Sequence, residues 1–445
     1  MRRFINNYTA AAVVLLLLAG FWFFAGSDQQ QVRQAPFLLL TGALFGLVLQ
    51  RSRFCFFCVL RDLFEYGNGK PAAGLIVALA VGSAGYLVLF GNWIADPSAG
   101  YLPQDAHIGP VSWHLLLGGL LFGWGMALSG SCISAHLYRL GEGYMVAPFA
   151  LAGSAAGFVI GFMVWNRLYV ATVSTSPVVW LPETGGYAVW ALIQITLLLA
   201  LMIWLLVRFQ GTSSAADESG CDPQGAALPG NTEMSRNTSV TAGVPGETSH
   251  LRVADDCMGP PATPSASAGS VAEKMTLSSI WNRVFVHRWP TWVGGIAVGV
   301  LSMIAYLRVE PLGVTAELGR YSRQLGSTLG ILPDRLEGLD GFAGCSTAAA
   351  PELLTGNGIF VLALVGGSLF SALLSGRFQL SRLTAMKAGK GLAGGMLLGF
   401  GAMISLGCTI GTTLSGISAF ALSGWVFSAA MVAGVWTGIR WKWHH

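Results

Sequence analysis

The chain has 445 residues, of which 53% are apolar and 10% are charged, and its mean hydropathy is +0.60. Because soluble domains carry about 25% charged residues, this composition excludes an ordinary soluble protein and indicates a membrane protein. The net charge of +4 gives no reason to expect a nucleic-acid partner.

Apolar runs along the chain are candidate membrane helices. They occupy residues 9–25, 36–54, 71–91, 114–131, 144–164, 188–207, 291–307, 358–376, 391–407 and 422–440. The first run is compatible with a signal peptide, but it lacks a small-residue cleavage site, which favours an uncleaved helix. Several runs are shorter than the ~20 residues of a full span, which predicts broken or re-entrant helices. We therefore expect an all-α, polytopic fold with about 9–10 spans.

A polar segment divides the chain into two halves. Residues 209–288 are rich in Ser, Thr, Gly and Pro without apolar periodicity, which predicts a disordered linker in which Cys221 and Cys257 are incidental. The expected domains are an extra helix with a short loop (1–35), a first half-repeat (36–208), the linker (209–288), and a second half-repeat (289–445) with an external insertion at 308–357.

Lysine and arginine distinguish the two sides of the membrane. The basic segments are 51–70, 208 with 274–288, 377–390 and 440–442, whereas 92–113 and 165–187 carry almost no positive charge. The positive-inside rule makes the first set cytoplasmic and the second set external. We therefore expect both termini in the cytoplasm.

Two glycine-rich helices that end in a cysteine are copies of one another. Shifting the first by 276 positions (408 minus 132) superposes seven of fifteen residues on identical ones. The superposed residues of the first copy are Gly118, Gly119, Leu121, Gly123, Gly125, Ser129 and Cys132. The charge pattern starts the first copy outside and the second inside, so the copies are inverted, as are the spans 36–54 and 291–307. Inverted repeats with broken helices are typical of transporters.

The two breaks are candidate anion sites. Small polar residues adjoin Cys132 and Cys408 there, among them Ser134, Thr409 and Gly411. Unpaired N–H groups and the positive end of a helix can hold an anion, and a thiol adds a weak donor that suits a sulfur-bearing ligand. Helix packing through small residues would explain the glycines, but not the same cysteine at both breaks.

A further cysteine pair lies at the end of the span 36–54. Cys55 and Cys58 lie among arginines that include Arg61, an arrangement that would attract an anion. The alternative is that the arginines are positive-inside anchors and the cysteines are apolar filler. The Cys-x-x-Cys spacing also fits a redox site, although no βαβ pattern surrounds it.

Four other residues are weaker candidates. Cys345 lies between polar flanks in the external insertion and is a candidate entrance residue. Arg139, Glu142 and Glu352 lie near predicted helix ends, where snorkelling or a surface ion pair is expected. No motif predicts a cofactor, a metal site or an ATPase.

Three stretches carry a family resemblance. The first runs from Phe45 and Gly46 through Gln50 to Phe54-Cys55-Phe56 and on to Arg61-Asp62. The second leads from Gly119, Gly123 and Gly125 to Cys132, and the third from Gly399 and Gly401 to Gly407-Cys408-Thr409 and Gly411. In these residues the chain resembles the YeeE/YedE family of bacterial inner-membrane proteins, whose characterised members take up thiosulfate.

The resemblance implies an hourglass-shaped, inverted-repeat bundle in which thiosulfate passes three aligned cysteines, which here are Cys55, Cys132 and Cys408. It also implies a multi-pass protein of the bacterial inner membrane, with a cytoplasmic sulfur-carrier protein as a candidate partner. The extra N-terminal helix, the linker and the insertion depart from the family's compact pattern. So does Ser131-Cys132-Ile133, where the family usually has Gly-Cys-Thr.

The leading hypothesis is therefore a permease, not an enzyme, for a small sulfur-containing anion, with thiosulfate as the first candidate. One alternative is a membrane thiol enzyme or sulfur relay that forms a cysteine persulfide. Others are a transporter of a selenium or other sulfur compound, and a structural subunit that packs through its glycines.

Overall fold

The computed structural model describes residues 34–209 and 287–443, apart from 95, 104, 310–312, 334 and 340–354, together with residues 12, 14 and 15. Most of the predicted first span, nearly all of the linker, Glu352 and Cys345 lie outside the described residues. Within them, the chain forms helices and no strands, and isolated β-bridges join Pro110 to Val178 and Trp180 to Ala421.

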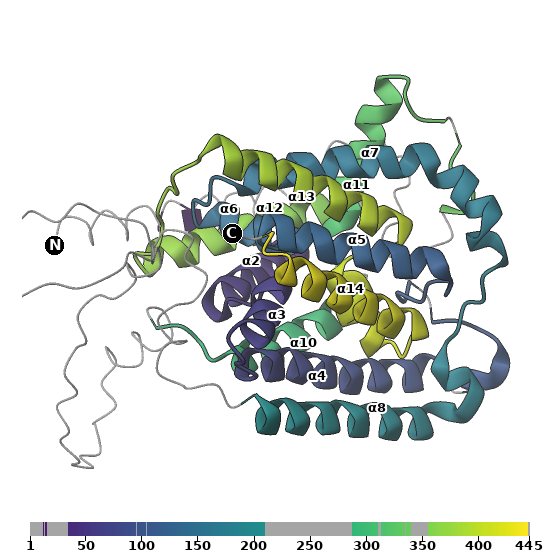
Figure 1. Ribbon diagram of the computed structural model, residues 1–445. Coiled ribbons are helices and arrows are strands. Elements are labelled where there is room, and N and C mark those ends of the chain that lie inside the picture. The colour runs from purple at the N-terminus through teal and green to yellow at the C-terminus, as the bar shows by residue number, and fades with distance from the viewer. Residues whose placement is uncertain are drawn as a thin grey trace, which may run out of the picture.

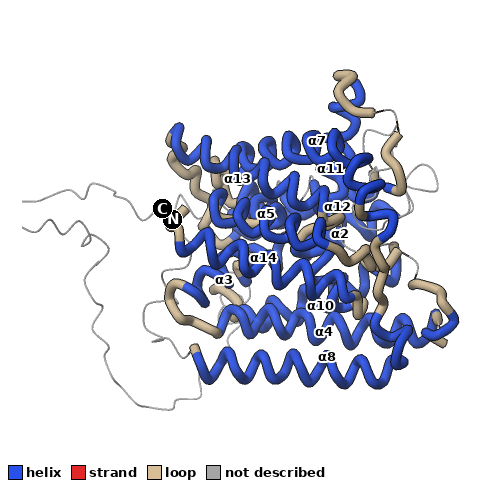
Figure 2. The backbone as a smooth tube through the Cα atoms, turned by 45° about the vertical axis from the view of Figure 1, so that its right-hand side comes forward, coloured by secondary structure: helices blue, strands red, loops and turns tan. Residues whose placement is uncertain are grey.

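The helices follow the predicted spans closely (Figures 1 and 2). The first half contains α2 (Ala35–Ser52), α3 (Phe56–Phe64), α4 (Lys70–Trp93), α5 (Trp113–Ser129), α6 (Ile133–Gly141), α7 (Ala147–Ala171) and α8 (Leu181–Arg208). The second half contains α10 (Thr291–Arg308), α11 (Val314–Thr328), α12 (Gly356–Leu374), α13 (Ala385–Ile404), the π-helix η6 (Thr409–Gly416) and α14 (Leu422–Arg440). Eight described helices are long and apolar enough to span a membrane, or nine if the bent pair α13–η6 is one span. The predicted all-α, polytopic membrane fold is confirmed.

Successive long helices run in opposite directions between two ends of the bundle. We call the end at which α2, α8 and α14 finish the basic end, because the basic segments of the sequence lie there. It is the left-hand end in Figure 1, and the opposite end is the far end. Helix α5 runs toward the basic end, whereas its copy α13 runs away from it. This direction agrees with an inverted repeat.

Helix packing follows the same symmetry. Helix α2 packs along α12, and in the equivalent pairing α10 packs along α4. Helix α7 packs along α13 just as α14 packs along α5. Each half thus buries its helices mainly against the other half, so the two halves form one interlocked bundle.

The copies α5 and α13 cross each other directly through glycines. A Cβ atom on Gly118 would lie 2.9 Å from the carbonyl oxygen of Gly401, and one on Gly401 would lie 2.8 Å from that of Gly118. Gly125 and Gly394 face each other in the same way, at 2.7 and 2.9 Å. Since the repeat relates Gly118 to Gly394 and Gly125 to Gly401, these are two equivalent contacts about one axis. Only glycine allows backbones to approach so closely.

Candidate substrate pathway

Three cysteines occupy the same position in three helix breaks. Cys55, Cys132 and Cys408 are the N-cap residues of α3, α6 and η6. In each break the residue two positions earlier has a positive φ angle: 48° at Arg53, 79° at Gly130 and 55° at Leu406. A left-handed residue ends a helix, so each cysteine begins a new short helix directly after a long one has stopped.

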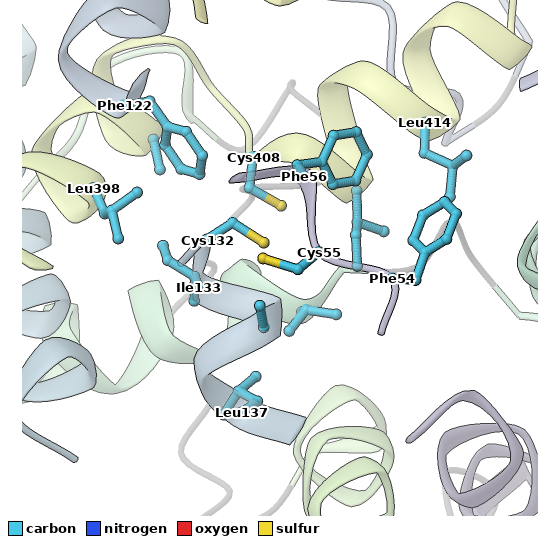
Figure 3. Packing of buried hydrophobic residues seen from close by; sticks show 14 of the residues in the cluster. Phe54, Cys55, Phe56, Phe122, Cys132, Ile133, Leu137, Leu398, Cys408 and Leu414 are labelled. Carbon is cyan, nitrogen blue, oxygen red and sulfur yellow. The ribbon is translucent and has the colours of Figure 1, made fainter. Parts of the chain in front are cut away.

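These breaks bring the three cysteines together at the centre of the bundle (Figure 3). The sulfur atoms of Cys55 and Cys132 point toward one another, and Cys408 lies beside Cys132. The side chains are free thiols and are only 0%, 2% and 1% exposed, respectively. The cluster is therefore closed to both ends of the bundle.

Small polar groups surround the thiols. The Cys55 sulfur lies 4.0 Å from the Ser131 hydroxyl oxygen, and the Thr409 hydroxyl lies beside the Cys132 thiol. The Cys408 sulfur accepts a hydrogen bond from the Gly411 backbone N–H at 3.5 Å. Two of the predicted secondary candidates, Thr409 and Gly411, thus adjoin the cluster.

The remaining secondary candidates lie toward the basic end or outside the described residues. Cys58 is buried on α3 in contact with the Arg139 guanidinium, and Ser134 is buried on α6. Arg61 forms an ion pair with Asp62 at 3.0 Å and stacks on Tyr66, so it is not brought to the thiols.

Arg139 corrects a sequence-based expectation. It was predicted to snorkel or to form a surface ion pair, but it is only 7% exposed. Its guanidinium donates to the Cys58 sulfur at 3.1 Å and to the Gly130 carbonyl at 3.3 Å. Glu142 also points inward and accepts a hydrogen bond from the Gln50 side chain at 3.1 Å. The signal that could have identified Arg139 is its spacing of seven residues from Cys132, which returns it to the same helix face.

On the far side of the cluster, a buried histidine was also missed. His107 belongs to the loop that joins α4 to α5, and its ring lies 3.0 Å from the Thr412 hydroxyl. It lines a small cavity of about 10 Å³ together with Ser405, Ser423 and other residues. Burial lowers the pKa of His107 to about 4, so the ring is neutral at ordinary pH.

This burial predicts acid sensitivity. Because the pKa of His107 falls from 6.5 to about 4 on folding, the folded protein binds fewer protons than the unfolded chain between these values. Its stability is therefore full above pH 6.5 and declines as the pH falls toward 4, by up to about 3 kcal/mol. Thermal unfolding of the detergent-solubilised protein from about pH 7.5 to about pH 3.5, a range that includes both pKa values, measures the loss. The His107→Gln variant, which does not titrate there, should show a smaller loss, and an equal loss would contradict the prediction.

The chain places weak donors in series across the bundle. The His107 ring contacts Thr412, which follows Cys408 by four residues. Cys408 lies beside Cys132, whose sulfur faces that of Cys55, and Cys58, three residues after Cys55, contacts Arg139. Several weak sites allow an ion to move on, whereas one deep site would trap it.

Comparison with known proteins points to one family. A family model described as sulphur transport matches residues 51–245 and 259–437, which include all three clustered cysteines. The thiosulfate transporter TsuA of Escherichia coli (strain K12) is 25% identical over 409 residues, covering 90% of this chain and 92% of that protein. TsuA of Spirochaeta thermophila is 25% identical over 406 residues, covering 90% and 96%. A probable transporter, YedE of Salmonella typhimurium, is 29% identical over 170 residues, covering 37% and 40%.

Proposed function

The chain belongs to the sulphur transport family and is a transporter of sulfur compounds, and we propose that its substrate is thiosulfate. Two relatives that match 90% of the chain are named thiosulfate transporters, which supports this choice. The observation that carries the proposal is the convergence of three buried thiols from three separate helix breaks.

The chemistry of the thiols fits the ends of thiosulfate. Thiosulfate is a dianion with a soft terminal sulfur at one end and a hard sulfonate group at the other. A thiol is a weak, polarizable donor that suits the terminal sulfur. Sulfate, which has only hard oxygens, gains less from such contacts. Cys55, Cys132 and Cys408 therefore favour thiosulfate over sulfate along the pathway.

The protein acts as a permease of the bacterial inner membrane and not as an enzyme. Its basic end, which carries the positive segments, faces the cytoplasm, so the substrate enters at the far end near His107. On this orientation, a cytoplasmic sulfur-carrier protein would receive the anion at the basic end.

Position-specific labelling tests the function. A bacterium that lacks its own thiosulfate uptake would express this chain and receive thiosulfate labelled either at the terminal sulfur or at the sulfonate sulfur. A permease delivers both labels to the cell equally, and excess selenite or sulfate competes poorly. The empty expression vector is the control.

Two outcomes would overturn the proposal. No uptake above the control would exclude thiosulfate as the substrate. Entry of only the terminal sulfur would indicate a sulfur relay, in which a cysteine thiolate attacks the terminal sulfur, the S–S bond breaks, and sulfite leaves with the bonding electron pair. Mass spectrometry would then find the added sulfur on a cysteine.

A further inference from the structure

We propose that His136, Arg139 and Cys58 form an oxyanion subsite on the basic-end side of the three thiols. It holds the sulfonate end of thiosulfate while the terminal sulfur lies against Cys55 and Cys132. This inference rests on the proposed function and assigns to the substrate a direction within the pathway.

The subsite lies along one face of α6. His136 follows the N-cap residue Cys132 by one turn, and its backbone N–H bonds to the Cys132 carbonyl at 3.0 Å. Arg139 follows by nearly two turns, so all three side chains lie on the same face of the helix. The Arg139 bonds to the Gly130 carbonyl and the Cys58 sulfur direct its guanidinium back toward the break.

His136 is the group that lacks a structural explanation. The residue is 0% exposed, and neither ring nitrogen has a hydrogen-bond partner among the described residues. Leaving a buried donor or acceptor unsatisfied costs about 1–3 kcal/mol, and buried polar groups are nearly always bonded. The ring interacts electrostatically with Arg139 and with the Cys55 thiol, and along α6 His136 lies between Arg139 and the N-cap residue Cys132.

A bound oxyanion would satisfy this ring. The imidazole N–H can donate to a sulfonate oxygen, and the Arg139 guanidinium supplies further donors and a positive charge. The Arg139 guanidinium contacts the Cys58 sulfur, the Gly130 carbonyl and the Tyr144 ring. A guanidinium at this position would offset part of the cost of moving a dianion out of water.

The two ends of the site then recognise the two ends of the substrate. Nitrogen donors bind the oxygens, and the thiols of Cys55 and Cys132 bind the terminal sulfur. A simple sulfonate would occupy the His136–Arg139 half without gaining the thiol contacts. Methanesulfonate is therefore the probe for this half alone.

The test compares variants that remove or keep the nitrogen donors. His136→Phe and Arg139→Met should each raise the KM for thiosulfate uptake about tenfold, which corresponds to about 1.4 kcal/mol. His136→Gln and Arg139→Lys, which keep an N–H donor or the charge, should recover part of the affinity. Methanesulfonate should compete with thiosulfate in the native protein but not in Arg139→Met.

The matched control is His114→Phe. His114 is a buried histidine in the first turn of α5, at the far end of the bundle. Its ring bonds to the Ser112 hydroxyl at 2.9 Å. Replacing it should therefore leave the KM for thiosulfate unchanged. If the native chain transports thiosulfate while His136→Phe and Arg139→Met keep the native KM, the subsite is excluded and the proposed function stands.

A native chain that fails to transport thiosulfate would exclude the proposed function. The subsite is then decided by heat stability of the purified full chain in methanesulfonate. Stabilisation of the native protein and His114→Phe but not of His136→Phe or Arg139→Met supports the subsite, and equal behaviour of all four, or no stabilisation of any, excludes it. Amounts of folded protein in the membrane identify variants that fail to assemble, and the Gln and Lys variants then decide the question.

Discussion

Replacing Cys132 with serine is expected to lower thiosulfate uptake about a hundredfold, equivalent to about 2.7 kcal/mol in the transport barrier. Cys132 lies between the Cys55 thiol and the Thr409 hydroxyl, so it is the middle of the series. Serine keeps the size and is a good N-cap residue, but its hard hydroxyl does not suit the terminal sulfur. The loss should therefore appear in transport and not in folding.

Uptake of labelled thiosulfate per amount of membrane-inserted protein measures this effect. Cys221→Ser is the control, because the sequence places Cys221 in the linker between the halves. Cys55→Ser and Cys408→Ser should also be impaired. Native uptake by the Cys132→Ser protein would show that the thiols do not form the pathway.

The sequence predicted the spans and the inverted repeat because both are written in local patterns. Apolar runs give the helices, and the identity of Gly118 with Gly394 and of Cys132 with Cys408 gives the repeat. Only the family resemblance predicted that Cys55 lies close to Cys132 and Cys408. The repeat could not supply it, because α11, which follows α10 as α3 follows α2, begins without a cysteine.

The composition of the segment did not predict the interior position of Arg139 and His136. A short segment that contains an arginine, a histidine and several glycines has the composition of a loop at a membrane surface. Its burial results from packing of α6 against α12 and α7, and α12 is far away in the sequence. Contact between the two halves thus buries the charge of Arg139, which the sequence had placed near a membrane surface.

The two halves share a backbone arrangement, but equivalent helices carry different residues. Helix α11 carries a buried ion pair in which Arg320 bonds to Glu317 at 2.6 Å, and the Thr355 hydroxyl donates to the same carboxylate. Its counterpart α3 begins with Cys55 instead. Since the N-cap residue of α11 is Gly313 where that of α3 is Cys55, the symmetry of the backbone does not extend to the thiol.

Replacing Gly394 with leucine is expected to prevent assembly of the bundle. A Cβ atom there would lie 2.6 Å from the Ser129 backbone nitrogen and 2.9 Å from the Gly125 carbonyl oxygen. Both neighbours are backbone atoms of α5 and cannot rotate away, so the cost should exceed the ~3 kcal/mol typical of overpacking. The measurement is the yield of monodisperse protein in mild detergent together with its unfolding temperature.

Gly389→Leu on the same helix separates packing from helix propensity. A Cβ atom at Gly389 would meet nothing within 4 Å, and leucine favours a helix over glycine by about 1 kcal/mol, so this variant should be as stable as the native protein or more so. Equal yields of both variants would contradict a close crossing of α5 and α13.

The crossing of α5 and α13 matters for transport because Ser129 is the last residue of α5 before the break at Cys132. The contact with Gly394 therefore fixes where α5 stops and where the central thiol lies.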